Sequence, residues 1–410
     1  MDGTATPFDR KQAIDTIRVL SIDAIQQANS GHPGAPMGAA PMTYALWTGS
    51  LKHAPSRPDW LDRDRFVLSA GHASMLLYSM LHLTGYDLPL DELKRFRQMG
   101  SKTPGHPEYG LTAGVEATTG PLGQGFTNAV GMAIAERRLA AEFNKPGHEL
   151  IDHHTYTLCS DGDLQEGIAS EAASLAGHLR LGKLIALYDD NDIQLDGPTS
   201  MAWSEDVLGR FEAYGWHTQR VADGEDVAAI SAAIEAAKAD ERPSIISVKT
   251  IIGAGSPNKA GTHKVHGAPL GADEVAATKA ALGFDPEAAF QVAPEVLSHF
   301  REAVDAGERL VAEWEARLAA YAEAFPAEGA ELRRRLEGVL AEGWDDDLPA
   351  YSTEDDDIAS RNASANASAG LAAGVPAVIG GSADLSGSNL TDIPDGGVFS
   401  ADEGGRNIRF

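Results

Sequence analysis

The sequence predicts an α/β fold, a parallel sheet with helices on both faces, followed by a second α/β unit that is truncated. Two observations lead to this fold. Short apolar runs alternate with segments of helical periodicity along most of the chain, as in a parallel sheet built from strand–helix–strand units. The clearest unit spans residues 156–191: an apolar run ends at Cys159, a helical pattern follows the break at 160–163, and a second apolar run covers 184–188.

Polar residues follow both strands of this unit. Asp161 comes directly after the first strand and Asn191 after the second. Because such crossovers are right-handed and join parallel strands, both side chains should lie at one edge of the sheet, where α/β proteins bind phosphorylated ligands. With the backbone carbonyl of Ile193 they offer three oxygens, which suits a Mg²⁺ ion that also binds a diphosphate. The alternative for an Asp-Gly pair after a strand is a plain turn.

Length and composition indicate a globular protein of several domains. The chain has 410 residues, which at about 150 residues per domain predicts two or three domains. A net charge of -27 argues against nucleic acid or an anionic membrane as a partner. The one cysteine, Cys159, excludes an intrachain disulfide and fits a reducing compartment. The start of the chain lacks the layout of a signal peptide and no apolar run approaches the ~20 residues of a membrane span, so a cytoplasmic protein is expected.

The N-terminal part begins with a helix and a loop. The helix is expected at 9–28, with Asp9 as N-cap and apolar residues on one face. Two glycines and two prolines around His32 then predict an irregular loop over the segment 29–38, which presents this histidine. A single loop histidine is most often solvated, which is the plain alternative here.

Two further histidines lie in similar positions. A strand at 65–69 turns into a helix at 75–84, and His72 stands at the N-terminus of that helix, where backbone N–H groups and the helix dipole favour anions. His106 is bracketed by proline and glycine in the loop 103–108. Three histidines in rigid loops favour a functional interpretation over three solvated side chains.

A glycine-rich loop at 118–125 precedes a helix of small residues at 126–143. The glycines allow a ligand to approach the backbone closely, although the pattern is not that of a dinucleotide site. Strands and helices then continue to alternate, and the loop 253–271, which carries His263 and His266, falls at the carboxyl side of a strand. The remaining elements are predicted as strands ending at Val221 and at 245–250, helices at 226–239, 272–282, 294–325, 327–340 and 358–373, and a strand at 375–379.

These elements divide the chain into three parts. Residues 1–325 form a large α/β domain, residues 326–357 form a helical and then acidic linker, and residues 358–410 begin a second α/β unit. The acidic run 345–357 is expected to be solvated. About fifty residues cannot bury an α/β core of their own, so the second unit is expected to be incomplete.

Several motifs resemble those of the transketolase family. They occur in this order: NSGHPGAPMG, SAGHASMLLYSMLHLTGY, TPGHPE, GPLGQG, SDGDLQEGIASEAASLAG, YDDN, FEAYGW, GSPNKAGTHKVHGAPLG and GSADLSGSN. They cover essentially the whole chain after its first residues, and include the Gly-Asp-Gly and Asn signature of thiamine diphosphate enzymes, with Ser160 in place of the first Gly. Deoxyxylulose-phosphate synthases and the first component of pyruvate dehydrogenase look different at SGHPG and TPGHPE, whereas dihydroxyacetone synthase shares more of the pattern.

The resemblance implies a parallel-sheet thiamine diphosphate-binding fold, with 1–325 as the pyrophosphate-binding domain and 358–410 as the start of the pyrimidine-binding domain. It implies a transferase, a homodimer that moves a two-carbon ketol unit between sugar phosphates, from a ketose such as xylulose 5-phosphate to an aldose such as ribose 5-phosphate. The pentose phosphate pathway and the Calvin cycle use this reaction. The implied cofactors are thiamine diphosphate and Mg²⁺, or Ca²⁺ or Mn²⁺ in its place.

The resemblance also implies roles for individual residues. The metal ligands would be Asp161, Asn191 and the carbonyl of Ile193. The cofactor would be bound by His72, Gly120, Leu122, Gly162, Asn191 and His266, and in the neighbouring subunit by Asp384. The catalytic residues, in contact with hydroxyls of the donor sugar, would be His32, His106 and His266. The substrate phosphate would be bound by Arg361 and Ser388, and a glutamate network across the dimer would include Glu166 and Glu171, for which plain surface charges are the alternative.

Two hypotheses follow for the activity of this chain. In the family, the glutamate that protonates the aminopyrimidine ring would lie a few residues past Phe410, so the chain alone is expected to bind Mg-diphosphate weakly and to be almost inactive. The other hypothesis is a non-catalytic cofactor-binding fragment that works by joining a second polypeptide with the missing half. An exposed sheet edge near 375–380 would support it. Hydrolase chemistry lacks support, because neither Gly-x-Ser-x-Gly nor His-Glu-x-x-His occurs.

Overall fold

The structure, a computed structural model, describes residues 8–410. The chain divides into two compact units, which are considered separately. The first contains the chain up to Ala133 and from His153 to Ala312, and the second contains Ile134–Asp152 and Glu313–Phe410. The boundaries predicted at 325 and 357 stay a prediction. Residues 1–7, where the sequence suggests no signal peptide, lie outside the described part, within which no helix is long and apolar enough to cross a membrane.

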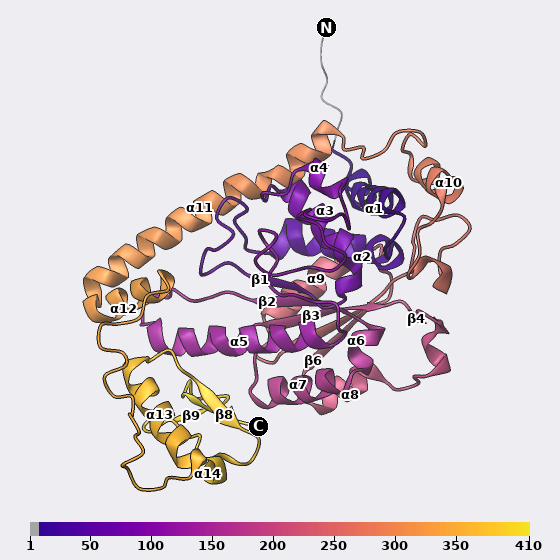
Figure 1. Cartoon of the computed structure of the whole chain (residues 1–410). Coiled ribbons are helices and arrows are strands. Elements are labelled where there is room, and N and C mark those ends of the chain that lie inside the picture. Colours follow the sequence, from indigo (N-terminus) through magenta and orange to yellow (C-terminus); the bar gives the residue numbers. More distant parts are fainter. Residues whose placement is uncertain (1–7) are drawn as a thin grey trace. The chain divides into compact units, whose positions relative to one another are not determined.

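A five-stranded parallel sheet forms the centre of the first unit (Figure 1). Its spatial order is β1 (Arg65–Leu68), β2 (Thr155–Ser160), β3 (Leu184–Asp190), β7 (Ser244–Lys249) and β6 (His217–Val221). All four neighbouring pairs are parallel, and β2 and β3 are in register up to Ser160 opposite Asp189. The predicted α/β fold is confirmed, and the segments that follow β2 and β3 leave the sheet at the same edge.

Helices cover both faces of this sheet (Figure 1). One face carries α1 (Arg10–Ala28), α2 (Gly34–Ala45), a π-helical turn (Leu46–Ser50), α3 (Ser74–Thr84) and α9 (Val227–Lys238). The other face carries α6 (Asp161–Gln165), α7 (Gly167–His178) and α8 (Val207–Ala213). The first unit also contains α4 (Leu90–Leu93) and α10 (Ala272–Leu282), and both units share residues of α5 (Gln124–Phe143) and α11 (Pro294–Ala324).

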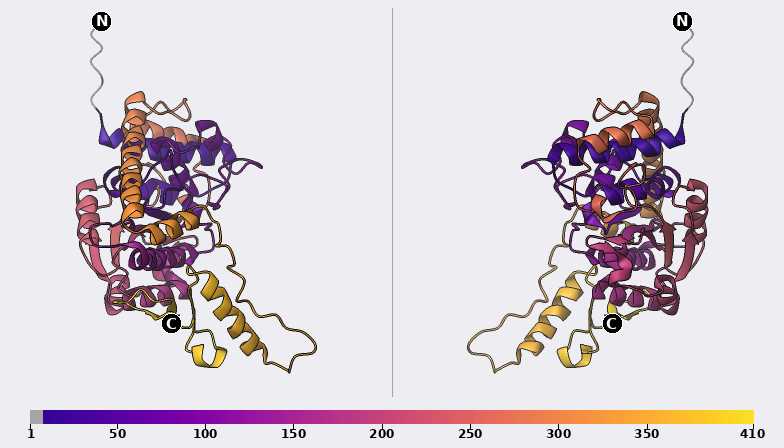
Figure 2. Two further views of the ribbon diagram at one scale, coloured as in Figure 1. Left: turned by 90° about the vertical axis from the view of Figure 1, so that its left-hand side faces the viewer. Right: turned by 90° about the vertical axis from the view of Figure 1, so that its right-hand side faces the viewer.

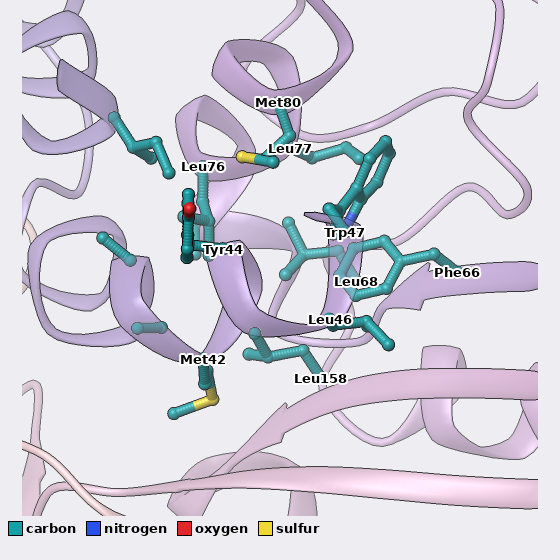
Figure 3. Packing of buried hydrophobic residues seen from close by; sticks show 14 of the residues in the cluster. Met42, Tyr44, Leu46, Trp47, Phe66, Leu68, Leu76, Leu77, Met80 and Leu158 are labelled. Atoms are coloured by element: carbon teal, nitrogen blue, oxygen red, sulfur yellow. The ribbon is translucent and has the colours of Figure 1, made fainter. Parts of the chain in front are cut away.

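Large apolar side chains fill the space between β1, α2 and α3 (Figure 3). Leu46 and Trp47 after α2, Phe66 and Leu68 in β1, and Leu77 in α3 are at most 4% exposed. Trp47 meets Phe66 edge-on with ring centroids 5.4 Å apart, an arrangement that the quadrupoles of aromatic rings favour. Burial of each such side chain contributes about 1.5–3 kcal/mol. This packing fixes the positions of β1, α2 and α3, and so supports the loops that connect to them at the edge of the sheet.

Helix α1 differs from the one-faced helix that the sequence predicts. Asp9 caps it as expected, since its carboxylate accepts a hydrogen bond from Lys11 N–H at 2.9 Å. Every residue from Ala13 to Ile25 is buried, however, so this stretch has no solvent face. Its charges pair inside the protein, where Arg18 donates to the Asp15 carboxylate at 2.8 Å. The cause is tertiary, because α2, α3 and α10 all pack against α1.

The predicted irregular loop at 29–38 is shorter than expected. Helix α2 begins at Gly34, so the loop ends at Pro33. Pro36 lies in the first turn of α2, where a backbone N–H has no partner within the helix, and proline is tolerated there for that reason. His32 therefore stands immediately before the N-terminus of a helix.

The second unit combines helices with a small parallel sheet. Its helices are α12 (Pro326–Leu336), α13 (Ser360–Gly374) and α14 (Ser386–Asn389). Its strands lie in the order β8 (Gly380–Ser382), β10 (Asn407–Arg409) and β9 (Val398–Phe399). Within the described residues, β8 and β9 each pair with β10 in parallel and with no other strand.

The strand predicted at 375–379 is wrong. These residues begin with a turn in which Val378 N–H donates to the carbonyl of Val375 at 3.1 Å. The Arg406 guanidinium donates to the carbonyls of Val375 and Val378 at 3.1 and 2.8 Å. Because these carbonyls already have partners, the strand begins later, at Gly380.

The acidic segment 345–357 has no helix or strand and is mostly exposed, as the sequence predicts. Figure 2 shows it as an open loop beside α13. The backbone at the start of this segment passes close to two glycines of this helix. A Cβ at Gly370 would lie 2.3 Å from the carbonyl oxygen of Asp347, and one at Gly374 would lie 1.9 Å from that of Trp344. Any larger residue at either position would force this part of the linker away from α13.

Candidate functional site

A cavity of about 500 Å³ opens at the carboxyl edge of the five-stranded sheet. It brings together most of the residues that the sequence singles out. Those residues are His32, His72, His106, Gly120, Leu122, Asp161, Gly162, Glu166, Asn191, Ile193 and His266. They belong to segments far apart in the chain, and the parallel sheet gathers several of them because its strands all end at this edge.

Four imidazole rings meet in this cavity. The ring centroid of His32 lies 5.2 Å from that of His72, 6.4 Å from that of His106 and 5.9 Å from that of His266. His72 and His266 stack with centroids 5.2 Å apart. The sequence predicts that these histidines have a function, and the structure adds that they form one cluster.

Burial keeps the clustered imidazoles neutral near pH 7. Removal from water, followed by the nearby His266 ring, lowers the pKa of His32 to about 4 and that of His72 to about 3. Burial also lowers the pKa of His106 and of His266. A neutral imidazole has one N–H donor and one bare nitrogen. The cluster can therefore donate hydrogen bonds to the hydroxyl groups of a ligand and accept hydrogen bonds from them.

Asp161 is a buried carboxylate in the cavity wall. It directly follows β2 and is 3% exposed. The Tyr188 hydroxyl donates to its Oδ1, whereas Oδ2 has no hydrogen-bond partner within the described residues. Burial raises the pKa of Asp161 to about 7 despite the hydrogen bond from Tyr188, and the nearby carboxylates of Asp189 and Asp190 add to the rise. A buried carboxylate with an unsatisfied oxygen and acidic neighbours fits a divalent cation.

Asn191 and Ile193 supply the other two predicted metal ligands. The Asn191 amide donates to Asp189 Oδ2 at 2.9 Å, and its own Oδ1 accepts from Ile193 N–H at 2.9 Å. These two bonds fix the orientation of the amide. No group of three or more His, Cys, Asp or Glu side chains in residues 8–410 is arranged to hold a metal. A metal here would therefore depend on the amide and carbonyl oxygens as well as on Asp161.

Two glycines keep the cavity wall open. Gly120 has a φ of 150°, which side chains rarely adopt, and a Cβ there would lie 3.3 Å from the His106 ring. A Cβ at Gly162 would lie 2.9 Å from Leu122 Cδ1. Without a side chain at either position, an anionic group such as a diphosphate can approach the backbone N–H groups. The residues present thus fit both the metal and the diphosphate.

Asp163 is a residue that the sequence reasoning missed. It is fully buried, and its carboxylate accepts hydrogen bonds from Ser69 Oγ at 2.7 Å, Gly123 N–H at 2.8 Å and Ser160 N–H at 2.9 Å. These donors come from three segments at the cavity. The pair Ser160 and Asp163 also forms a capping box, so residues 161–165 are the helix α6 and the predicted break is wrong. The spacing Ser-x-x-Asp was the available signal.

The serine that replaces the first glycine of the Gly-Asp-Gly signature causes no strain. Ser160 has φ of -120° and ψ of 175°, an extended conformation open to any residue. Its hydroxyl donates to Asp163 Oδ2 at 3.1 Å. The departure from the signature therefore leaves the backbone of the cavity wall unaffected.

Four predicted site residues do not line the cavity in the described structure. They are Glu171 on α7 and, in the second unit, Arg361, Asp384 and Ser388. All four are exposed. Their predicted roles stay predictions, as does the role of Glu166, which is exposed but lines the cavity.

Comparison with known proteins gives a consistent family. The family model "Transketolase, thiamine diphosphate binding domain" matches residues 9–341. The chain is 58% identical over 401 residues to the transketolase of Geobacillus stearothermophilus, covering 97% of this chain and 60% of that protein. It is 55% identical over 403 residues to the transketolase of Bacillus subtilis, covering 98% of this chain and again 60% of the relative.

Solved structures that resemble this chain belong to the same family. A transketolase from Pichia stipitis, in complex with sedoheptulose 7-phosphate, superposes with a TM-score of 0.95 at 48% identity, covering 97% of this chain and 60% of that chain. The transketolase of Leishmania mexicana gives a TM-score of 0.95 at 48% identity, covering 98% and 60%. The chain thus spans about 60% of the length of the proteins it matches.

Proposed function

Because the chain belongs to the transketolase family and carries its thiamine diphosphate-binding domain, we propose that the protein takes part in ketol transfer. The reaction would move a two-carbon unit from a ketose phosphate such as xylulose 5-phosphate to an aldose phosphate such as ribose 5-phosphate. The pentose phosphate pathway or the Calvin cycle would use it, and the active form would be a cytoplasmic homodimer. The observation that carries the proposal is one cavity that holds four imidazoles together with Asp161 and Asn191.

The cavity residues divide into a metal set and a diphosphate set. Asp161 Oδ2, the Asn191 amide oxygen and the Ile193 carbonyl would hold Mg²⁺, because all three are the hard oxygen donors that this ion prefers. The diphosphate would be bound by His72, Gly120, Leu122, Gly162 and His266. Thiamine diphosphate, when bound, supplies the electron sink for cleavage of a carbon–carbon bond.

The neutral imidazoles would handle the sugar. His32, His106 and His266 would orient the donor by hydrogen bonds to its hydroxyl groups, and a bare imidazole nitrogen can take a hydroxyl proton near pH 7. Arg361 and Ser388 would bind the phosphate of the substrate, since a guanidinium binds phosphate through paired N–H donors. Asp384, Glu166 and Glu171 would belong to contacts between subunits.

The substrate class has support from the solved relatives. Transketolases from Pichia stipitis are described as complexes with sedoheptulose 7-phosphate, xylulose 5-phosphate and fructose 6-phosphate. All three are ketose phosphates with several hydroxyl groups. A cavity lined by four imidazoles offers hydrogen-bond partners for such groups.

The test is ketol transfer from xylulose 5-phosphate to ribose 5-phosphate, with thiamine diphosphate and Mg²⁺. The 410-residue chain is assayed alone and together with a second polypeptide. This polypeptide is the part of a related transketolase that follows the region matched by this chain. We expect almost no turnover from the chain alone and restored turnover with the added polypeptide. Full turnover by the chain alone would contradict the predicted need for a glutamate from the part of the relatives that this chain does not match.

A pair of variants tests the metal site. Asp161→Ala should abolish binding of Mg-thiamine diphosphate, measured by titration calorimetry, because the other two metal ligands are neutral oxygens. Asp59→Ala, which removes an exposed carboxylate of a surface loop, is the matched control and should bind as the unchanged chain does. Equal binding by both variants would show that Asp161 is not a metal ligand.

A second function has one observation in its favour. In the second unit, the outer strand β8 pairs with β10 on one side, and no strand pairs with its other side within residues 8–410. Such strands can accept a further strand, as expected of a cofactor-binding fragment that joins a second polypeptide. The free edge lies at β8, which begins at Gly380, the last residue of the range 375–380 that the sequence predicts, whereas Phe399 of β9 forms a bridge with Gly404. In an assay with formaldehyde as the acceptor in place of ribose 5-phosphate, faster transfer of the two-carbon unit, with dihydroxyacetone as product, would favour the remaining alternative, dihydroxyacetone synthase.

A further inference from the structure

Arg97 connects two of the histidine loops of the cavity. Its backbone N–H donates to the carbonyl of Thr103 at 2.9 Å, just before the loop that carries His106. Its guanidinium Nη1 donates to Ser30 Oγ at 2.7 Å, and Nη2 lies 3.5 Å from Nδ1 of His32. One side chain and its backbone therefore hold the loops of both His32 and His106.

The conformation of Arg97 is unusual in a way that favours this role. Its φ is 60°, in the left-handed region that non-glycine residues seldom adopt and that strained functional positions retain. The loop of His106 passes against the guanidinium, where a Cβ at Gly105 would lie 3.1 Å from Arg97 Nε. Within the described residues no carboxylate pairs with Arg97 and its Nε has no partner. A surface ion pair therefore does not explain where this side chain lies.

The contact with His32 determines where that ring carries its proton. A guanidinium has donors only, so Nδ1 of His32 must be the acceptor and the proton of the neutral ring must be on Nε2. The other groups that face His32 are the rings of His72, His106 and His266. All of them would be cations if protonated, so none of them favours a charged His32.

We propose that Arg97 is a positioning residue that fixes His32 as a neutral imidazole with its proton on Nε2. Nε2 makes no hydrogen bond within the described residues and lies on a ring that lines the cavity. His32 is then a donor to a hydroxyl or carbonyl oxygen of the sugar, a role that rests on the proposed ketol transfer. Arg97 itself does not line the cavity and acts through His32.

The test is nitrogen NMR of the chain labelled with ¹⁵N-histidine, with His32 assigned from the signal that His32→Gln removes. Correlations between ring nitrogens and ring protons distinguish a bare nitrogen from a protonated one. We expect a bare Nδ1 and a protonated Nε2 at pH 7, and a titration midpoint near 4, the pKa of His32. A protonated Nδ1 at pH 7 overturns the proposal without any variant.

Variants at position 97 distinguish the effect of the guanidinium on His32 from the effect of the rest of the loop. Arg97→Met removes donor and charge, so the signal of Nδ1 should move toward that of a mixed population. The titration midpoint should rise but stay below the free value, because burial and the His266 ring still lower the pKa of His32. Arg97→Lys keeps a cationic donor and should preserve the bare Nδ1. Arg95→Met, at an exposed neighbour that pairs with Glu92, is the control and should change neither signal. An unchanged His32 in Arg97→Met overturns the proposal.

The NMR result does not depend on turnover. If ketol transfer failed in the complemented assay while His32 kept the expected protonation, the proposed function would be wrong and the link between Arg97 and His32 would stand. If turnover were present and Arg97→Met left His32 unaltered, the proposed function would stand and the link between Arg97 and His32 would be wrong.

Discussion

Asp163 shows how one side chain can hold several loops at a binding site. Its carboxylate accepts from Ser69, Gly123 and Ser160, and all of these contacts are buried. A buried donor without an acceptor costs about 1–3 kcal/mol. Asp163→Ala should therefore lower the free energy of unfolding by about 3 kcal/mol, measured by urea titration and circular dichroism.

The control for Asp163 is a carboxylate of the surface. Asp59→Ala should change the free energy of unfolding by no more than about 0.5 kcal/mol, as exposed substitutions usually do. If the two variants were equally stable, the three hydrogen bonds would contribute nothing measurable.

His53 makes stability depend on pH. It is 5% exposed, packs against Trp47 and Tyr86, and burial lowers its pKa to about 4. The unfolded chain takes up a proton at this residue below about pH 6.5 and the folded chain does not until about pH 4, so stability falls as pH falls through this window. One such histidine contributes a loss of about 1.4 kcal/mol between pH 7.5 and pH 5.5.

Variants isolate the contribution of His53. Urea unfolding at the two pH values should show a smaller loss for His53→Asn than for the unchanged chain, by about 1.4 kcal/mol. His178→Asn removes an exposed histidine and should keep the full loss. The same loss in all three proteins would mean that folding does not lower the pKa of His53.

At the scale of elements, substitutions of two glycines of α7 by alanine are predicted to change the free energy of unfolding in opposite directions. A Cβ at Gly177 would lie 1.9 Å from the carbonyl oxygen of Tyr214, whereas Gly167 has open space around it. Gly177→Ala should therefore separate α7 from the segment before β6 and lower the free energy of unfolding by about 3 kcal/mol or more, as overpacking against a backbone does. Gly167→Ala should raise it by up to about 1 kcal/mol, because alanine is the better helix residue.

The elements that the sequence predicts well are those that local pattern defines. The strands of the central sheet and the long helices appear where apolar periodicity places them, because a buried strand or a long amphipathic helix leaves a clear trace. The alignment of Asp161 with Asn191 at one edge also follows from the pattern, since parallel strands fix it. The loops around His32, His72 and His106 and the glycine-rich loop also stood out from the residues alone, and family resemblance added the roles of His266 and of the individual glycines.

The errors have tertiary causes. Val375 and Val378 read as a strand, but their carbonyls bind the Arg406 guanidinium from a distant part of the chain. The solvent face expected for α1 is covered by three other helices. Arg97 lies in no motif, and its contacts with Ser30 and His32 depend on how separate loops meet. Single-sequence reasoning contains no information about such long-range contacts.

At the scale of the whole molecule, exposure predicts where a protease attacks first. Residues 351–361 are all exposed, and Glu354 is the one glutamate among them. Proteases need an extended segment, which exposed chain without helix or strand provides. Brief digestion with a glutamate-specific protease should first cut after Glu354, as mass spectrometry of the intact fragments would show.

One variant checks the site of that cut. Glu354→Gln should slow the first cleavage strongly while leaving the later cuts unchanged. A first cut after Glu108, an exposed glutamate in the long loop before α5, would show that this loop opens more readily than the acidic linker.

Cys159, the single cysteine of the chain, lies in strand β2 with no exposed surface, and its sulfur donates to the carbonyl of Leu187 in β3, the central strand of the sheet. Burial raises the pKa of this thiol well above its usual value, so the folded protein has no reactive thiolate. The protein thus contains its own reporter. A thiol reagent can modify it only in molecules whose β2 and β3 have come apart, and the rate of modification measures how often the centre of the sheet opens, without any engineered label.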